Sequence, residues 1–420
     1  MNSKDLIDEL GLTRLINLSG TETVFGASPV SPEVVRAIAG ILPHSVEMAE
    51  LQGLASRTIA AATGAEAGCV TGCTSASIVI SAAACMTGLD LGKIEQLPDT
   101  TGMKNEIVIQ KGHVVNYGST ITGDLRLTGA RVVEFGAALE TGVYQLSAAL
   151  SDRTAAACYV VSHHAAPTGM IPLPLFIETC HAHGVPVIVD AAAEYGWRGI
   201  LAAGADLVLF SAQKAVGGPT AGIIAGKRDM VRASYAQQRG IGRPMKAGKE
   251  SVVGAIAALR RWMALDHAAV SRAIDARAAE LARRLSRLPG VTASRVADET
   301  GNPFSRVHLT VDPPLAGFSA QGLDMALSRM RPRLIVRSLL ADRGVLQIDV
   351  RRLEPDGLDF VSDRILAAAE QARAAADAAP PAPPADRSGA AIVDWLGDEA
   401  DLRKIDSPKG LCEPQTLGRL

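Results

Sequence analysis

The chain has 420 residues, enough for two or three domains of ~100–200 residues each. Hydrophobic residues make up 48% and charged residues 20% of the chain, as in an ordinary globular protein. The net charge of -2 gives no reason to expect a nucleic acid or an acidic membrane as partner. The six scattered cysteines, the charged start without an apolar signal core and the lack of any run of about 18 apolar residues indicate a cytoplasmic protein with no membrane segment.

The first two predicted regions are an N-terminal segment and a large domain. Residues 1–45 are expected to form an irregular arm with one helix at 33–41, because Ser31-Pro32-Glu33 is typical of a helix start. From 46 to 255, short apolar stretches alternate with helical ones such as 175–183, which predicts an α/β domain on a parallel sheet. The expected strands, apolar on both faces, are 106–110, 131–135, 156–161, 185–190, 206–211 and 222–225.

A second, smaller α+β domain is expected at 256–377. Residues 251–288 are rich in Ala, Leu and Arg and predict a long helical region that leads into it. Strands are expected at 305–311 and 345–350, followed by a closing helix at 356–376. Residues 378–420 begin as a Pro/Ala linker, which cannot continue a helix, and end in a tail to which no role is assigned.

The strongest chemical signal is Lys214, three residues after Ser211 and followed by Gly217-Gly218-Pro219. It comes directly after an expected strand, so it should lie at the edge of the sheet where α/β folds bind ligands. An amine buried there loses its charge more easily and can form an imine with an aldehyde. A lysine in a solvated turn is the alternative.

Asp190 is the second signal, because it ends the apolar stretch VPVIVD. A carboxylate at such a place needs a cationic or hydrogen-bonding partner. A protonated pyridine nitrogen is such a partner, and keeping it protonated makes a cofactor an electron sink. An N-cap of the following helix is the alternative, and the sequence does not separate the two.

The third signal is the turn Thr71-Gly72-Cys73-Thr74-Ser75, which precedes a helix of small apolar residues. Hydroxyl groups, free N–H groups and the positive end of the helix dipole converge in such a turn and can bind an anion. Ordinary capping of a helix is the alternative. The turn matches neither a Walker P-loop nor a dinucleotide-binding fingerprint.

Together these features match the fold-type I pyridoxal-phosphate enzymes, and among them the chain resembles the selenocysteine synthase-like (SelA-like) family, nearest to its ammonia-lyase-type metabolic relatives. The resembling stretches, within residues of about 14–375, are INLSGTETVFGASPVS, TGAEAGCVTGCTSAS, GVPVIVDAAAE and GADLVLFSAQKAVGGPTAGIIAGKRDMV. The resemblance implies a large domain with a mostly parallel seven-stranded sheet, a smaller α+β domain, and a homodimer or higher homo-oligomer.

The resemblance also implies roles for individual residues around pyridoxal 5'-phosphate. Lys214 would carry the Schiff base and shuttle protons, and Asp190 would pair with the pyridine nitrogen. His113 would cover the ring face, although a polar loop histidine is equally compatible with the sequence. The residues expected around the phosphate are Cys73, Thr74, Ser75, Ser211 and, beside them, Gln213.

The substrate side is implied by the resemblance and by position. Arg351 matches the family's arginine of the small domain and would bind the substrate carboxylate through two parallel hydrogen bonds, with Arg352 as a rival. His163 and His164 follow an expected strand; we expect them to contact substrate or to take part in catalysis, and a loop pair is the alternative. No metal site is predicted.

The implied reaction is α,β-elimination from a small hydroxylated or sugar-derived amino acid, giving a 2-oxo acid and ammonia. Racemisation or epimerisation, aldol cleavage and β-replacement are alternatives on the same scaffold, since they differ in side-chain placement rather than in motif. The family's longer N-terminal tRNA-binding domain is not found here, which argues against a tRNA substrate. A nucleotide-binding oxidoreductase lacks its fingerprint here, and a non-catalytic relative would have no reason to keep both Lys214 and Asp190.

Overall fold

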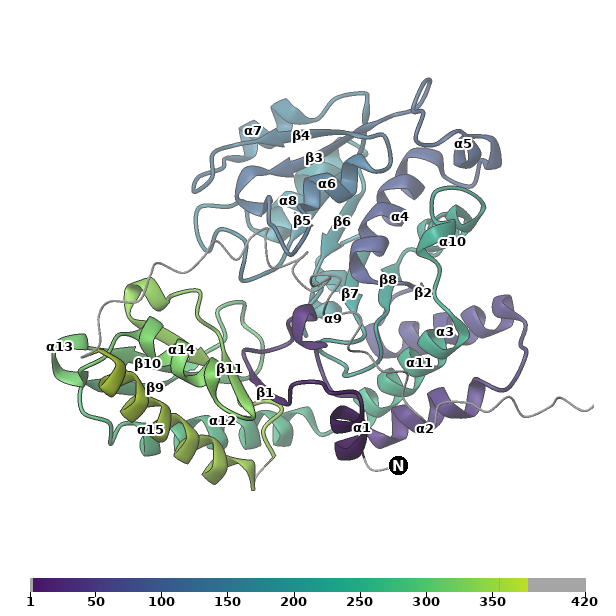
Figure 1. Ribbon diagram of the computed structural model, residues 1–420. Helices are drawn as coiled ribbons and strands as arrows, with labels where there is room; N and C mark the ends of the chain where they lie inside the picture. Colours follow the sequence, from purple (N-terminus) through teal and green to yellow (C-terminus); the bar gives the residue numbers. More distant parts are fainter. Residues whose placement is uncertain (1–2, 355, 377–420) are drawn as a thin grey trace, which may run out of the picture. The chain divides into compact units, whose positions relative to one another are not determined.

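The largest sheet has seven strands in the order β2-β8-β7-β6-β5-β3-β4 (Figure 1). The structure is a computed structural model and describes residues 3–354 and 356–376. In sheet order the strands are Ala67–Thr71, Gly222–Gly226, Leu207–Ser211, Val187–Asp190, Thr154–Val160, Glu106–Gln110 and Arg131–Phe135. All pairs from β7 to β4 are parallel, which confirms the expected mostly parallel sheet.

Both faces of this sheet are buried, because successive side chains of a strand point to opposite faces. Val208 and Phe210 of β7 pack in one core, and Leu207 and Leu209 in the other. The helices on the first face are α2 (Pro32–Ile41), α3 (Met48–Thr63), α7 (Val143–Ala149), α8 (Leu173–Ala182), α9 (Trp197–Ala202) and α11 (Lys249–Ala264). The helices on the second are α4 (Thr74–Thr87), α6 (Ile121–Arg126) and α10 (Arg228–Ala236).

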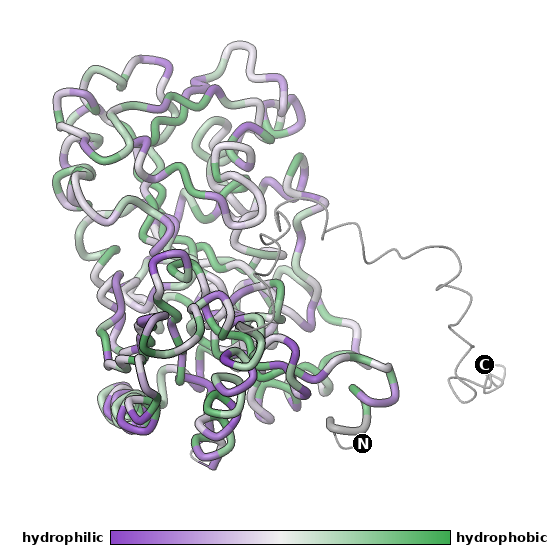
Figure 2. Tube along the Cα trace, turned by 60° about the vertical axis from the view of Figure 1, so that its left-hand side comes forward, coloured by the Kyte–Doolittle hydropathy of each residue, from purple (hydrophilic) through white to green (hydrophobic). Residues whose placement is uncertain are grey.

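A second group of elements surrounds a core of its own. Its antiparallel sheet has the order β12-β10-β9 and consists of Val345–Ile348, Ser305–Val311 and Val291–Ala297. The helices that share this core are α12 (His267–Leu285), α14 (Ala320–Arg329) and α15 (Gly357–Ala376). Strand β1 (Leu15–Leu18) pairs in parallel with β11 (Arg333–Val336) and so joins the start of the chain to this group. In Figure 2, hydrophobic and hydrophilic residues alternate along the trace of the outer helices. This is expected for helices that bury one side and expose the other.

The remaining elements are short. They are α1 (Ser3–Glu9), α5 (Leu91–Gln96), α13 (Pro313–Ala316) and the 3-10 turns η1 (Thr23–Phe25), η2 (Lys111–His113), η3 (Gln237–Arg239), η4 (Arg243–Met245) and η5 (Ala341–Arg343). None of the described helices is both long and apolar enough to cross a membrane.

Three sequence-based predictions need correction. The N-terminal segment is not irregular, since it holds α1, β1 and η1 as well as the predicted helix. Strand β8 is antiparallel to both neighbours, because the residues between β7 and β8 are too few for the crossover that a parallel pair needs. The long helical region is two helices, because Asp266 accepts a hydrogen bond from the Ala269 N–H at 2.9 Å and starts α12.

The predicted division into domains stays a prediction. The boundary between residues 255 and 256 falls inside α11, a helix whose buried residues pack with those of α2 and α3. The site described below lies within the compact unit Met1–Ala372. The predicted linker and tail at 378–420 lie outside the described residues.

Candidate active site

The site forms where three neighbouring parallel strands end. β5 ends at Val160, β6 at Asp190 and β7 at Ser211, and carboxyl ends of parallel strands share one edge of a sheet. Backbone hydrogen bonds continue past the strands: Val161 N–H donates to the Asp190 carbonyl at 2.8 Å, and Ser211 N–H to the Ala192 carbonyl at 3.0 Å. The loops that follow therefore converge on one place.

Lys214 lies in the turn after β7, and its backbone is held from two sides. Its carbonyl oxygen accepts hydrogen bonds from Ser28 Oγ at 3.1 Å and from Arg352 Nη2 at 3.2 Å. Gly217 permits the turn because its φ of 67° lies in the left-handed region that favours glycine. Burial lowers the pKa of the Lys214 ammonium, while the negative charges of Asp190 and Glu194 oppose that shift.

Asp190 is buried, with 4% of its surface exposed. Its Oδ1 accepts a hydrogen bond from the Ala192 N–H at 3.1 Å. Burial raises the pKa of Asp190 to about 6, against the lowering effect of the Lys214 charge. Lys214 and Asp190 therefore act on each other electrostatically, and a cationic ring nitrogen is the kind of partner that this carboxyl lacks.

The N-terminus of α4 has the features of an anion site. Cys73 is the N-cap residue, and its Sγ accepts from the Ala76 N–H at 3.4 Å. The buried hydroxyl of Thr74 has no hydrogen-bond partner among the described residues. The first N–H groups of a helix also lack partners within the helix. A phosphate group would satisfy these donors, so the residues present fit pyridoxal phosphate. Ser211 is buried at 3% exposure, and the side-chain oxygen of Gln213 is likewise buried without a described partner.

Ser75 lies in a cluster that the sequence did not reveal. Its hydroxyl donates to Asp124, which also accepts from Tyr117 at 2.6 Å and from Ser119 at 3.0 Å. Asp124 is buried, and burial together with the Asp124 bond raises the pKa of Tyr117. The hydroxyl of Ser75 is thus held in place by a carboxylate rather than left free.

His113 is buried, with 3% of its surface exposed. Its Nδ1 accepts from the Val160 N–H at 3.0 Å, and its Nε2 lies 3.1 Å from the side-chain nitrogen of Gln110. Its ring meets that of Tyr159 edge to face, with centroids 4.3 Å apart. Burial lowers the pKa of His113 to about 4, so the ring is neutral at pH 7.

His163 and His164 lie together at the mouth of the site, with ring centroids 3.9 Å apart. Burial, followed by the charge of Arg337, lowers the pKa of His163 to about 2, and the same causes lower that of His164. His163 is therefore neutral at pH 7, and it is better suited to form hydrogen bonds with a ligand than to act as a positive charge.

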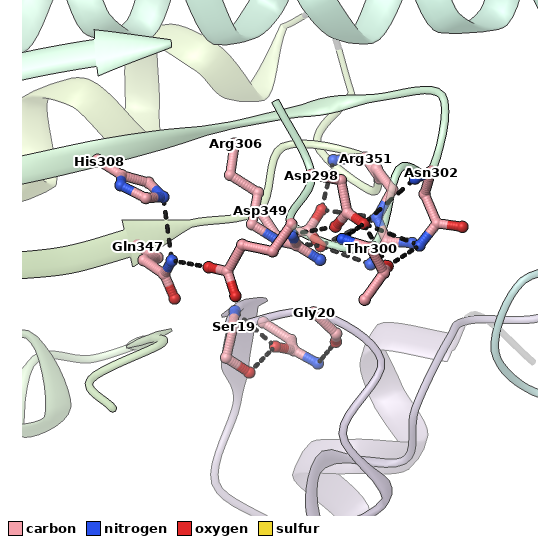
Figure 3. A network of polar contacts seen from close by, with 12 residues as sticks. Ser19, Gly20, Asp298, Thr300, Asn302, Arg306, His308, Gln347, Asp349 and Arg351 are labelled. Carbon is pink, nitrogen blue, oxygen red and sulfur yellow. Dashed lines mark hydrogen bonds and ion pairs between the residues drawn. The ribbon is translucent and has the colours of Figure 1, made fainter. Parts of the chain in front are cut away.

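Arg351 is already paired with protein groups. Its guanidinium forms an ion pair with Asp349 at 2.6 Å, donates to Tyr195 Oη at 3.1 Å and lies 4.0 Å from the centroid of the Phe304 ring. Arg351 holds the pKa of Asp349 down at about 2. Figure 3 shows Arg351 beside Asp349 within a network that includes Arg306. Arg352 contacts the Lys214 turn instead.

One cavity of about 330 Å³ brings together part of the predicted site, without Asp190, His113 or the residues expected around the phosphate. It is lined by Lys214, His163, His164 and Arg351 from the predicted set, and by Tyr117, Glu194 and Arg337, which the prediction missed. A neighbouring cavity of about 440 Å³ shares Arg351 and Phe304 with it but not Lys214. Glu194 ends the quoted stretch DAAAE and follows β6, so its place after a strand was the signal that could have found it.

Comparison with known proteins agrees with this geometry. Residues 15–300 match the family described as L-seryl-tRNA selenium transferase. The D-glucosaminate-6-phosphate ammonia lyase of Salmonella typhimurium is 35% identical over 368 residues, which are 88% of this chain and 99% of that enzyme. A 5'-C-glycyluridine monooxygenase-decarboxylase from a Streptomyces species is 38% identical over 358 residues, 85% of this chain and 90% of the relative.

Solved structures agree as well. A structure of D-glucosaminate-6-phosphate ammonia-lyase superposes with a TM-score of 0.79 at 35% identity, covering 87% of this chain and 98% of that one. A Sphingomonas wittichii serine palmitoyltransferase, 16% identical with a TM-score of 0.54 over 85% of this chain and 88% of that one, shares the fold. The chain is thus a fold-type I, pyridoxal-phosphate-dependent enzyme. Within that class it belongs to the L-seryl-tRNA selenium transferase (SelA) family.

Proposed function

We propose that the chain is a lyase that catalyses α,β-elimination from a small hydroxylated or sugar-derived amino acid, releasing a 2-oxo acid and ammonia. The observation that carries this proposal is that Lys214 lines a cavity at the edge of the sheet while its charge and that of the buried Asp190 act on each other. The ammonia lyase that is 35% identical over nearly its whole length supports it.

The residues around the cavity can be given roles with the cofactor. Lys214 Nζ would form the Schiff base with the aldehyde of the cofactor, and the Asp190 carboxylate would pair with the ring nitrogen of the cofactor. The phosphate would be held by the N-terminus of α4 and the Thr74 hydroxyl, with Cys73, Ser75, Ser211 and Gln213 around it, and we assign His113 to the ring face. When bound, the cofactor withdraws electrons from the substrate's Cα and weakens its bond to hydrogen.

Proton transfer at Cα is assigned to Lys214. Once the substrate amine has taken the place of its own, the Lys214 amine is free to accept a proton. Burial favours the neutral amine that a base needs. The neutral rings of His163 and His164 at the cavity wall are suited to accept and donate hydrogen bonds to substrate hydroxyls, and His164 to assist proton transfer by relay.

Oxidative decarboxylation is the second candidate. The Streptomyces monooxygenase-decarboxylase is 38% identical over 90% of its own length. Racemisation, aldol cleavage and β-replacement need the same lysine and carboxyl and stay alternatives.

An activity panel tests the proposal. The cofactor-loaded chain is incubated with D- and L-serine, D- and L-threonine and D-glucosaminate while ammonia, 2-oxo acid, oxygen and optical rotation are followed. Elimination predicts ammonia and 2-oxo acid in equal amounts without oxygen uptake, and Lys214→Ala should abolish both. Oxygen uptake with release of carbon dioxide would favour the second candidate. Optical rotation lost without ammonia would overturn elimination in favour of racemisation.

We also propose that the chain acts on a small molecule in the cytoplasm and assembles as a homodimer or higher homo-oligomer. Support comes from Val24 and Leu339, which line the cavity and are 77% and 61% exposed in the single chain. Exposed apolar residues of this kind are expected where a second subunit would cover them. Sedimentation analysis would reveal a stable monomer if this proposal were wrong.

A further inference from the structure

Glu194 is a buried carboxyl group of the cavity that no role above uses. It lies four residues after Asp190, in the connection from β6 to α9, and only 4% of its surface is exposed. It lines the same cavity as Lys214, and its charge acts on the Lys214 ammonium. The group therefore shares a cavity with the amine to which we assign the Cα proton.

Two neutral donors from another loop hold this carboxyl. Glu194 Oε2 accepts from Thr300 Oγ1 and from Asn302 Nδ2, each at 2.7 Å. Both donors lie between β9 and β10, and Figure 3 shows them together next to Asp298. Among residues 3–354 and 356–376 no lysine, arginine or histidine forms an ion pair with Glu194.

Without a paired cation, burial favours the protonated form. Burial raises the pKa of Glu194, and the nearby charge of Asp298 adds to that effect. The hydrogen bonds from Thr300 and Asn302 and the charge of Arg306 act in the opposite direction. The net shift is upward, toward the range in which a carboxyl can give up and regain a proton during turnover.

Three other groups that line the cavity, Asp298, His163 and Lys214, are less suited to donate a proton. Asp298 is paired with Arg306, and its pKa is lowered. The pKa of His163, about 2, leaves that ring without a spare proton at neutral pH. Lys214 is occupied with the Cα proton in the proposed reaction.

We propose that Glu194 is the general acid of the elimination, a role that rests on the proposed function. Lys214 takes the Cα proton, the Cβ–oxygen bond breaks, and its electron pair leaves on oxygen. Glu194 protonates that oxygen, so water departs and Glu194 becomes a carboxylate. The proton held by Lys214 then restores the Glu194 acid, and no oxidant or reductant is needed.

The test compares two leaving groups in full-length, cofactor-loaded Glu194→Gln. The amide keeps the size of the side chain and an oxygen that can accept from Thr300 and Asn302, but it has no acidic proton. For serine, which loses hydroxide, kcat/KM should fall by roughly 10²- to 10⁴-fold. For β-chloroalanine of the same configuration, kcat/KM should stay near the wild-type value, because chloride leaves without a proton. Exchange of the serine Cα proton with deuterated solvent should continue.

A control variant and the opposing results complete the test. Glu299→Gln makes the same change in the loop between β9 and β10 that carries Thr300 and Asn302, at a carboxyl that accepts from Gln347 Nε2 at 2.9 Å and does not line the cavity. It should leave both substrates unaffected. Equal losses for serine and β-chloroalanine in Glu194→Gln would overturn the proposal and indicate a structural role. A wild-type enzyme that eliminates β-chloroalanine but neither serine nor any other hydroxyamino acid would overturn the proposed function itself.

Discussion

Arg337 and Arg351 both line the cavity, yet their surroundings differ. Arg351 is paired with Asp349 and Tyr195, whereas the guanidinium of Arg337 has no hydrogen bond or ion pair among the described residues. Arg337 is nevertheless buried, at 6% exposure. An unpaired guanidinium beside a cavity suits an anionic ligand, so the substrate carboxylate has two candidate partners.

We predict that the two alanine variants affect different properties, substrate binding for Arg337 and stability for Arg351. Arg337→Ala should raise KM by roughly 10- to 100-fold, because it removes a charge-assisted hydrogen bond to the substrate that contributes about 1.5–3 kcal/mol. Its melting temperature should not change. Arg351→Ala should instead lower the free energy of unfolding by about 3–5 kcal/mol, because Asp349 is left buried without its main partner. Steady-state kinetics and thermal unfolding of both variants check this. A raised KM with normal stability in Arg351→Ala would favour the clamp that the family resemblance implies.

Sequence could identify some site residues and not others, for a physical reason. Lys214 and Asp190 follow recognisable apolar strands, and that position alone places them at the ligand-binding edge of the sheet. The absence of a described partner for Arg337 depends on which acids reach which arginines in the folded chain, and the sequence does not show that choice. Arg306, for example, pairs with Asp298, while Arg351 pairs with Asp349.

At the scale of elements, strands with one solvated face escaped prediction. The burial pattern of β9 alternates little and leaves several residues exposed, so Val291–Ala297 contains no apolar run. β11 is only four residues long and begins with the exposed Arg333. The buried strand β3 was predicted with its observed ends, and so was β4, although only its last residue, Phe135, is buried. Burial on both faces helps to make a strand visible in sequence, but β2, which is buried throughout, also escaped prediction.

The close approach of β8 to the start of α4 gives an element-scale prediction. A Cβ on Gly222 would fall on the Cys73 carbonyl and the Ser77 hydroxyl, at the N-terminus that we assign to the phosphate. Gly222→Ala should therefore displace α4, reduce stability by about 1–3 kcal/mol and weaken cofactor binding. Thermal unfolding and cofactor titration measure both effects.

Gly40 offers the matched control for that variant. It lies in α2 with open space around its Cα, and it is exposed. Gly40→Ala should be neutral or stabilise by about 0.5–1 kcal/mol, since alanine favours a helix. Equal behaviour of the two variants would show that β8 and α4 can separate without cost.

For the whole molecule, buried histidines make stability depend on pH. His113 takes up a proton near pH 6.5 when unfolded but only near pH 4 when folded. The contribution of neutral His113 to the free energy of unfolding is therefore complete above pH 6.5 and is lost as pH falls from 6.5 toward 4. The loss is roughly 2 kcal/mol between pH 7 and 5. Asp190 acts in the opposite sense, because its pKa is raised to about 6 and its ionisation weakens the cofactor-free fold as pH rises.

His113→Gln isolates the histidine contribution, because glutamine does not titrate and can still accept from the Val160 N–H. We expect the wild-type melting temperature to fall more between pH 7 and pH 5 than that of His113→Gln, with both proteins free of cofactor. Asp190 remains in both proteins, so its opposing effect cancels in the comparison. If the melting temperatures of the two proteins changed with pH in parallel, His113 would be protonated in the folded chain. A charged imidazole cannot accept the hydrogen bond that the Val160 N–H now donates, so it would need another partner.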